Sequence, residues 1–290
     1  MSRIYEALEK ARKEKEKLVK TGIGIGAMGT SPAPPVMPFG TRKETEEELQ
    51  KHGLVYSISP VVLSYHAPKC TIAEEYRIMR TNFLSMAQDG GAKRPIKSVV
   101  ISSSNHREGK SVTAVNLSVA LAQEGQQRVL LVDCDFRKPS IRKLMGIKPK
   151  HDLISVLTKD IPLEKAIIPT PVNNLEVMVV NTVPSNPAEL IGSTKMKKIL
   201  AALRKTYDYV IYDSPPIMAV TDAVVLGTEV DGLIMVLQAR RTQRERVRDA
   251  EDLLRQAHAN LLGFVLTDVR SYIPRYLNRY RYYTTYKYVE

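Results

Sequence analysis

The residues with the clearest chemical potential are the consecutive Gly109, Lys110 and Ser111. They follow an apolar run at 97–103 and precede a second apolar stretch. A strand, a loop ending in Gly-Lys-Ser and a helix make a P-loop. Its helix N-terminus and lysine bind phosphate, and its serine hydroxyl ligates Mg²⁺. We therefore expect ATP and Mg²⁺ as cofactors, with nucleotide contacts from Ser104, Arg107, Glu108, Gly109, Lys110, Ser111 and Val112.

The loop departs from the usual P-loop pattern at its first position. The pattern G-x-x-x-x-G-K-[ST] places glycine where this chain has Ser104. Taken alone, this degenerate match leaves a chance Gly-Lys-Ser at a helix start as an equal alternative. Other parts of the sequence must decide between the two interpretations.

Carboxylates at the ends of two apolar runs favour the P-loop interpretation. Asp133 and Asp135 follow the run that begins at residue 128, and Asp213 ends the run at 209–213. Residues two apart share one face of an extended strand, and close carboxylates repel unless a cation lies near them. The alternative is an ordinary turn in which aspartate caps a helix. With the P-loop upstream, the pattern predicts a magnesium site formed by Ser111, Asp133 and Asp213.

Apolar runs rich in Val, Ile and Leu alternate with helical segments through most of the chain. Near-continuous apolar runs are typical of strands covered on both faces. The predicted fold class is α/β, a P-loop NTPase-like doubly wound, mostly parallel sheet with helices on both faces. Thr242 and Glu245 predict a capping box at the last helix. The predicted strands are 97–103, 128–133, 175–181, 209–213, 232–238 and 261–267, and the predicted helices are 71–84, 110–123, 193–204 and 244–257.

Segments of different composition flank this alternating region. The N-terminal segment is rich in Lys and Glu, and its narrow apolar stripe fits a solvated helix or a docking helix for another chain equally well. That stripe is Ile4, Leu8, Ala11 and Leu18. The expected organisation is a charged helix at 1–20, a flexible Gly/Pro-rich linker with a short acidic segment at 21–60, the P-loop domain at 61–270 and a tyrosine-rich tail at 271–290.

The amino-acid composition limits the cellular compartment and the binding partners that we expect for this protein. The formal charge of +12 favours an acidic partner: nucleic acid, an anionic membrane face or an acidic protein surface. Cys70 and Cys134 match no metal-ligand spacing, which favours reduced thiols in a cytosolic protein. No apolar run approaches the roughly 20 residues that cross a bilayer. We therefore expect a soluble cytoplasmic protein that reaches a membrane through a partner.

Several ordered motifs resemble those of the bacterial tyrosine kinases of capsule and exopolysaccharide biosynthesis, the BY-kinases. The loop ending in Gly-Lys-Ser looks like the Walker A motif of that family, D-C-D-F-R-K-P like its Walker A′, and Y-D-S-P-P like its Walker B. The T-D-A at residues 221–223 and the terminal tyrosine cluster match as well. The resemblance covers about three quarters of the chain, from about residue 70 to the C-terminus.

The resemblance implies a tyrosine autokinase that regulates polysaccharide synthesis or export at the inner face of the cell membrane. Lys110, Asp133 and Asp135 are then catalytic, with Asp213 supporting the metal and activation of the tyrosine hydroxyl. The helix motif E-x-x-R-x-x-R implies assembly into a ring through Glu74, Arg77 and Arg80, with salt bridges inside the helix as the alternative. Expected partners are other copies, a membrane-bound polysaccharide co-polymerase as activator and a tyrosine phosphatase. The expected phosphate acceptors, modified in trans, are Tyr280, Tyr282, Tyr283, Tyr286 and Tyr288.

One difference between this P-loop and that of the family leaves two alternative functions open. The family has Pro-Gly where this loop has His106 and Arg107, and Arg107 costs roughly 1–2 kcal/mol if that position needs positive φ. A catalytically weak, nucleotide-binding regulatory subunit is therefore one alternative. A partitioning-type ATPase is another, although 102–105 lack the extra lysine of that class. The basic tail also resembles a single-stranded nucleic-acid binder, an interpretation that we disfavour.

Overall fold

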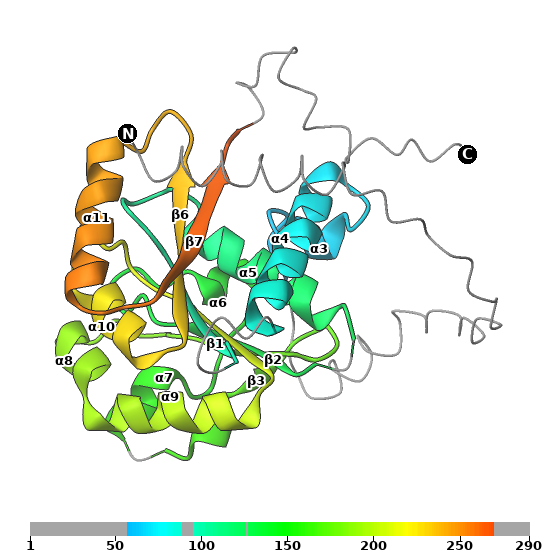
Figure 1. The fold of residues 1–290 in the computed structure, drawn as a ribbon. Coiled ribbons are helices and arrows are strands. Elements are labelled where there is room, and N and C mark those ends of the chain that lie inside the picture. Colours follow the sequence, from blue (N-terminus) through cyan, green and yellow to red (C-terminus); the bar gives the residue numbers. More distant parts are fainter. Residues whose placement is uncertain (1–56, 89–94, 126, 160, 270–290) are drawn as a thin grey trace, which may run out of the picture. The chain divides into compact units, whose positions relative to one another are not determined.

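A seven-stranded sheet forms the centre of the residues that the computed structural model describes, which are 57–88, 95–125, 127–159 and 161–269 (Figure 1). Its order is β3-β4-β2-β5-β1-β6-β7, and only the β3–β4 pair is antiparallel. The strands are β1 (Ser98–Ser103), β2 (Val129–Asp133), β3 (Ile168–Pro169), β4 (Leu175–Met178), β5 (Tyr209–Asp213), β6 (Gly232–Gln238) and β7 (Leu261–Thr267).

The register of the central strands brings their carboxyl ends to one level. Asp133 at the end of β2 is the partner of Asp213 at the end of β5, and Asp213 is also the partner of Ile101 in β1. All residues of these three strands are buried, as expected for strands covered on both faces. The loop that follows β1 therefore leaves the sheet beside both aspartates.

Helices cover both faces of the sheet, and two apolar cores result. One core holds side chains from the first group of helices and includes Phe83, Leu117 and Ile141. These helices are α3 (Leu63–His66), α4 (Thr71–Gln88), α5 (Lys110–Ala122) and α6 (Ile141–Leu144). The second core lies between the other face and α7 (Leu153–Thr158), α8 (Pro187–Gly192), α9 (Thr194–Thr206), α10 (Asp222–Glu229) and α11 (Arg244–Gln256), with a short 3-10 helix, η1 (Leu163–Ala166), nearby.

The predicted fold class is confirmed, and all six predicted strands and four predicted helices are present with ends shifted by a few residues. The capping box was wrong. Gln243 rather than Thr242 is the N-cap of α11, and it makes no side-chain capping bond; the Thr242 hydroxyl instead accepts from the Gln238 N–H at 2.9 Å and donates to Glu108. No helix among the described residues is long and apolar enough to span a bilayer. The expected charged helix at 1–20, most of the linker and the tyrosine tail lie outside the described residues.

Candidate nucleotide-binding active site

The P-loop joins the end of β1 to α5 through two residues with left-handed backbone. Gly109 is the N-cap of α5 with φ of 95°, a conformation that glycine adopts without steric cost. Arg107 has φ of 63°, so the position where the family has glycine does need positive φ. Arg107 therefore carries backbone strain of about 1–2 kcal/mol inside the loop.

Lys110 lies at the centre of a cluster of carboxylates at the sheet edge. Its Nζ lies 2.8 Å from Asp135 Oδ2, 3.5 Å from Asp213 Oδ1 and 3.3 Å from Ser111 Oγ. Burial alone would lower the pKa of Lys110, but the carboxylates of Asp213 and Asp135 outweigh it and raise that pKa. The lysine is therefore a fixed cation at a helix N-terminus, as phosphate binding requires.

Asp213 is fully buried, and its contacts among the described residues are long: the Lys110 ammonium lies 3.5 Å from Oδ1 and the Ser111 hydroxyl is close by, with no well-formed hydrogen bond to either carboxylate oxygen. Burial raises its pKa, and the neighbouring Lys110 ammonium opposes the rise. A buried carboxylate with only such long contacts is costly unless another group also satisfies it. Mg²⁺ or one of its water ligands fits this position, with Ser111 next to it. The described residues contain no cluster of three His, Cys, Asp or Glu side chains suited to a metal, so phosphate and water oxygens would complete the ligand set.

Asp133 has a different environment from the other two aspartates. One oxygen accepts from the Asp135 N–H at 3.1 Å, and the other from the Ser140 and Ile141 N–H groups at 3.0 Å each. Asp133 thereby holds the loop after β2 against the start of α6. Burial and the nearby Asp213 raise the pKa of Asp133 to about 8. The argument that Asp133 and Asp135 share one strand face was wrong, because β2 ends at Asp133.

The predicted nucleotide contacts at the start of the loop make bonds inside the protein. The Glu108 side chain is buried and accepts from the Asn105 N–H at 2.9 Å and from the Thr242 hydroxyl. The Ser104 hydroxyl, also buried, donates to the Arg246 carbonyl at 3.3 Å. These side-chain bonds to the protein interior hold the P-loop in place. They leave the backbone N–H groups of the loop available to a phosphate.

Sequence reasoning missed two further contacts beside the site. Arg137 makes a two-pronged ion pair with the buried carboxylate of Asp222, at 3.0 and 3.4 Å, which ties the loop after β2 to the start of α10. The Thr267 hydroxyl at the end of β7 donates to the Glu108 carbonyl at 3.0 Å. Arg137 and Asp222 belong to motifs noted above, but their pairing spans 85 positions and leaves no local signal.

The E-x-x-R-x-x-R helix is α4, where the three residues have different partners. Arg77 forms an ion pair with Glu74 within the helix. Arg80 instead pairs with Glu124 after α5 and donates to the Ala120 carbonyl at 3.3 Å. Only the first of the two expected intrahelical salt bridges is therefore present.

This fold and this site define a P-loop nucleotide-binding α/β protein. A family model described as an AAA domain matches residues 97–258. The chain is 38% identical over 205 residues to the tyrosine-protein kinase YwqD of Bacillus subtilis, covering 71% of this chain and 84% of that protein. It is 33% identical over 227 residues to the putative tyrosine-protein kinase CapB of Staphylococcus aureus, covering 78% and 96%. The chain belongs to the bacterial tyrosine-protein kinase family.

Solved structures agree with this assignment. The kinase domain of the Escherichia coli tyrosine kinase ETK matches with a TM-score of 0.69 at 26% identity, covering 79% of this chain and 94% of that one. The chimerical protein CapA2B2 matches with a TM-score of 0.66 at 32% identity, covering 78% and 98%. The septum site-determining protein MinD with Mg-ADP from Pyrococcus horikoshii has a TM-score of 0.54 at 24% identity over 62% of this chain and 75% of that one, which shows the fold alone. The kinase interpretation is thus favoured over the partitioning-type ATPase.

Proposed function

We propose that this chain transfers the γ-phosphoryl group of Mg-ATP to tyrosine hydroxyls, including those of its own C-terminal segment in other copies. The observation that carries the proposal is the Lys110 ammonium held between Asp135 and Asp213 at the carboxyl ends of β2 and β5. Phosphoryl transfer depends mainly on positioning and charge neutralisation. Family membership supports tyrosine as the acceptor.

The three aspartates have different roles in the proposed reaction, and each role follows from the atoms that contact the aspartate. When bound, Mg-ATP supplies the transferable phosphoryl group and a metal charge that offsets its oxygens. Lys110 holds phosphate oxygens, and Asp213 with Ser111 holds the metal. Asp135 is the acceptor of the tyrosine proton, since its Oδ2 lies 2.8 Å from the Lys110 ammonium that holds the phosphate oxygens. Asp133 positions the loop that carries Asp135, because backbone N–H groups already occupy both of its oxygens.

Phosphotyrosine formation with Mg-ATP tests this proposal. Lys110→Met, Asp133→Ala and a chain ending at residue 270 should each lose the label, while the exposed-lysine control Lys198→Met should keep it. Nucleotide binding, followed by calorimetry, should weaken in Lys110→Met and persist in the truncated chain. Full labelling of both Lys110→Met and Asp133→Ala would refute the site assignment.

The wider cellular role belongs to the same proposal. We infer that the chain regulates capsular or exopolysaccharide synthesis together with a membrane-bound co-polymerase, a tyrosine phosphatase and other copies of itself. Support comes from the resemblance and from the charge of +12, which suits the anionic inner face of a bacterial membrane. Association of the purified chain with the cytoplasmic segment of such a co-polymerase, and a resulting rise in phosphotyrosine, would test it.

The strained Arg107 supports a second candidate, a nucleotide-binding regulatory subunit with weak catalysis. Nucleotide binding without any phosphotyrosine, even with the co-polymerase segment present, would select this candidate over the kinase.

A further inference from the structure

The ion pair between Arg137 and Asp222 joins the two loops that follow the aspartate-bearing strands β2 and β5. Arg137 lies two residues after Asp135, in the loop between β2 and α6. Asp222 is the first residue of α10, which comes after the loop that follows Asp213. Arg137 Nε lies 3.0 Å from Asp222 Oδ2, and Nη2 lies 3.4 Å from Oδ1. Two parallel contacts of this kind fix the orientation of the guanidinium as well as its distance from the carboxylate.

A contribution to stability alone explains this pair poorly. The side chain of Asp222 is fully buried, whereas that of Arg137 is 40% exposed. The free energy that it costs to take a carboxylate out of water often exceeds what the ion pair returns, and apolar side chains of similar size can stabilise a fold as well. The pair does supply a defined geometry between segments that are 85 positions apart. That geometry is therefore the better guide to its role.

The position of the Asp135 carboxylate follows that of the residues directly after it. Oδ1 of Asp135 accepts the Lys138 N–H at 2.9 Å, a bond within the loop. Because of this bond, the carboxylate moves together with residues 136–138. Oδ2 lies 2.8 Å from the Lys110 ammonium. A displacement of residues 136–138 would therefore change the position of Oδ2 in the site.

Two neighbouring side chains attach residues 136–138 to the domain. Phe136 is fully buried in the apolar core that also contains Ile217 and Ala223. Apolar packing holds such a side chain in place but carries little directional preference. The contact between Arg137 and Asp222 is directional, because both oxygens of the carboxylate accept from the planar guanidinium. Arg137 thus fixes how this part of the loop is oriented.

The proposed reaction needs a support for Asp135 that does not bind the nucleotide. Lys110 contacts Asp135 here, but the same ammonium holds phosphate oxygens when Mg-ATP is bound. A proton acceptor must lie about 2.6–3.2 Å from the hydroxyl that it deprotonates, and a misplacement of about 1 Å can cost about 100-fold in rate. The hydrogen bond to Asp222 raises the pKa of Arg137, burial opposes the rise, and the charge of Asp135 adds to it. Arg137 is thus a permanent cation close enough to act on Asp135.

We propose that Arg137 is a positioning residue, whose two-pronged pair with Asp222 holds the loop after β2 so that Asp135 meets the tyrosine hydroxyl. The inference rests on the proposed function, in which Asp135 accepts the tyrosine proton. Arg137 acts through Asp135 and not on the substrate itself. Asp222 shares the role, because the loop is held only while both members of the pair are present.

Phosphotyrosine formation by the full chain with Mg-ATP tests the proposal. Arg137→Ala and Asp222→Ala should each lower kcat by at least about tenfold. The Kd for Mg-ATP, measured by calorimetry, should stay within about twofold of the wild-type value, because neither residue binds the nucleotide. Arg137→Lys keeps the charge but not the two-pronged contact, so it should recover part of the rate.

A double variant separates loss of the pair from the burial of an unpaired charge. Arg137→Ala alone leaves the buried Asp222 carboxylate without its partner, which also lowers stability. Arg137→Ala combined with Asp222→Ala leaves no such charge. Since both changes remove the same pair, the double variant should be no slower than the slower of the two single variants.

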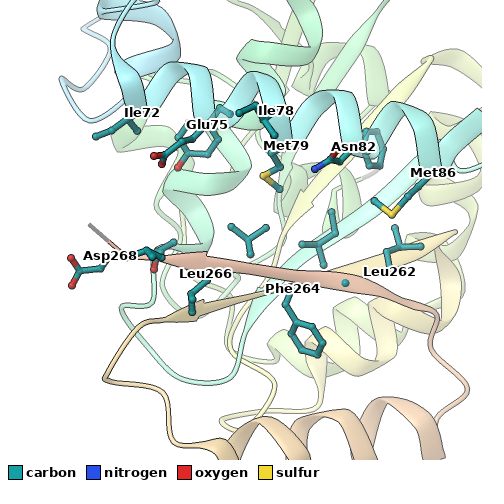
Figure 2. A pocket seen from close by; sticks show the side chains of 17 residues that line it. Ile72, Glu75, Ile78, Met79, Asn82, Met86, Leu262, Phe264, Leu266 and Asp268 are labelled. Carbon is teal, nitrogen blue, oxygen red and sulfur yellow. The ribbon is translucent and has the colours of Figure 1, made fainter. Parts of the chain in front are cut away.

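Two controls separate positioning from a general loss of stability. Leu262 lines an apolar groove between α4 and β7 (Figure 2), near the amino end of β7 and so at the sheet edge opposite the site. Leu262→Ala removes apolar contacts there and should lower the free energy of unfolding without changing kcat. Arg142→Ala replaces an exposed arginine of α6 and should change neither quantity.

Wild-type kcat in the double variant would overturn the proposal. So would an equal fall in kcat in Leu262→Ala, which would trace the effect to stability, or a Kd for Mg-ATP that rises in step with the fall in kcat, which would assign the pair to nucleotide binding. Losses that multiply in the double variant would show that the two residues act separately and would also overturn it. A wild-type chain that forms no phosphotyrosine would instead refute the proposed function, and the positioning role with it.

Discussion

The hydroxyl of Thr267 donates a hydrogen bond to the main-chain carbonyl of Glu108 over 3.0 Å, and so joins the end of β7 to the P-loop. The loop is supported from the same side by Thr242, whose hydroxyl donates to the Glu108 carboxylate, and by Arg241, which donates to the Arg107 carbonyl at 3.2 Å. The conformation of the loop before ligand binding thus depends on residues more than 130 positions away.

Thr267→Val should therefore weaken nucleotide binding, although Thr267 lies behind the site. The change keeps the side-chain shape and removes one hydrogen bond, worth about 0.5–1.5 kcal/mol, so the Kd for ATP should rise about twofold to tenfold. Calorimetric titration with Mg-ATP measures it. Thr267→Ser should bind as the wild type does, as should Thr206→Val, which removes a comparable hydroxyl bond in α9. An unchanged Kd in Thr267→Val would mean that the loop does not need this bond.

Arg107→Gly should raise the free energy of unfolding of the protein and lower its affinity for ATP. Glycine removes the left-handed strain of about 1–2 kcal/mol, and its greater freedom in the unfolded chain offsets about 0.5–1 kcal/mol. The free energy of unfolding in urea should rise by about 0.5–1 kcal/mol, while loss of the guanidinium removes a predicted phosphate contact. Arg107→Ala separates the two effects, because it removes the charge and keeps the strain. A more stable Arg107→Gly variant with wild-type ATP affinity would exclude the phosphate contact.

Much of the site was predictable because a single strand–loop–helix unit builds its phosphate-binding part. Gly109, Lys110 and Ser111 occur where the predicted strand and helix meet, and the buried runs before Asp133 and Asp213 identify parallel neighbours. Helices α3, α6, α7, α8 and α10 and strand β3 were missed, since elements of two to eight residues are too short to show a clear period.

What the sequence did not reveal are the bonds between distant segments. Thr242 and Glu245 have the spacing of a capping box, yet α11 begins one residue later, and the Thr242 hydroxyl accepts from the Gln238 N–H and donates to the distant Glu108. Asp133 and Asp135 have the spacing of a strand face, but the backbone turns after Asp133 so that Ser140 and Ile141 can donate to it. The spacing of neighbouring residues carries no information about a hydrogen-bond partner that lies far away in the sequence.

Asp231→Asn should lower stability at neutral pH and have little effect in acid. Burial alone would raise the pKa of Asp231, but hydrogen bonds from Arg204 and from the Lys97 and Ser98 N–H groups outweigh it and hold that pKa below its ordinary value. A depressed pKa in the folded state adds stability above the unfolded-state pKa of about 3.9, and this stability is lost as the pH falls through the folded-state pKa.

Urea unfolding of wild type and Asp231→Asn across pH 7.5 to 4 measures the effect. The difference should be about 1–2 kcal/mol near neutrality, since the group bonds several donors yet is partly exposed to solvent. It should begin to shrink near the acid end of the series. The exposed control Asp249→Asn should show no such trend. A difference that stays constant or grows toward acid pH would show that these bonds do not favour the ionised carboxylate.

The last prediction separates assembly from folding on α4. The Arg80 side chain is 14% exposed and is held by Glu124 and the Ala120 carbonyl. The Arg77 side chain is 39% exposed, and its partners among the described residues are Glu74 in α4 and the Pro68 carbonyl just before that helix. Arg80→Ala should therefore lower the free energy of unfolding of the single chain by about 1–3 kcal/mol, because it removes a mostly buried guanidinium together with its bonds to the exposed Glu124 carboxylate and to the Ala120 carbonyl. Arg77→Ala should change stability by less than about 1 kcal/mol. If the motif serves assembly, as the resemblance implies, sedimentation should show fewer oligomers for Arg77→Ala at unchanged stability, and Arg77→Lys should restore part of the assembly. Arg77→Ala assembling as the wild type does, with only Arg80→Ala affected, would assign the motif to folding of the single chain.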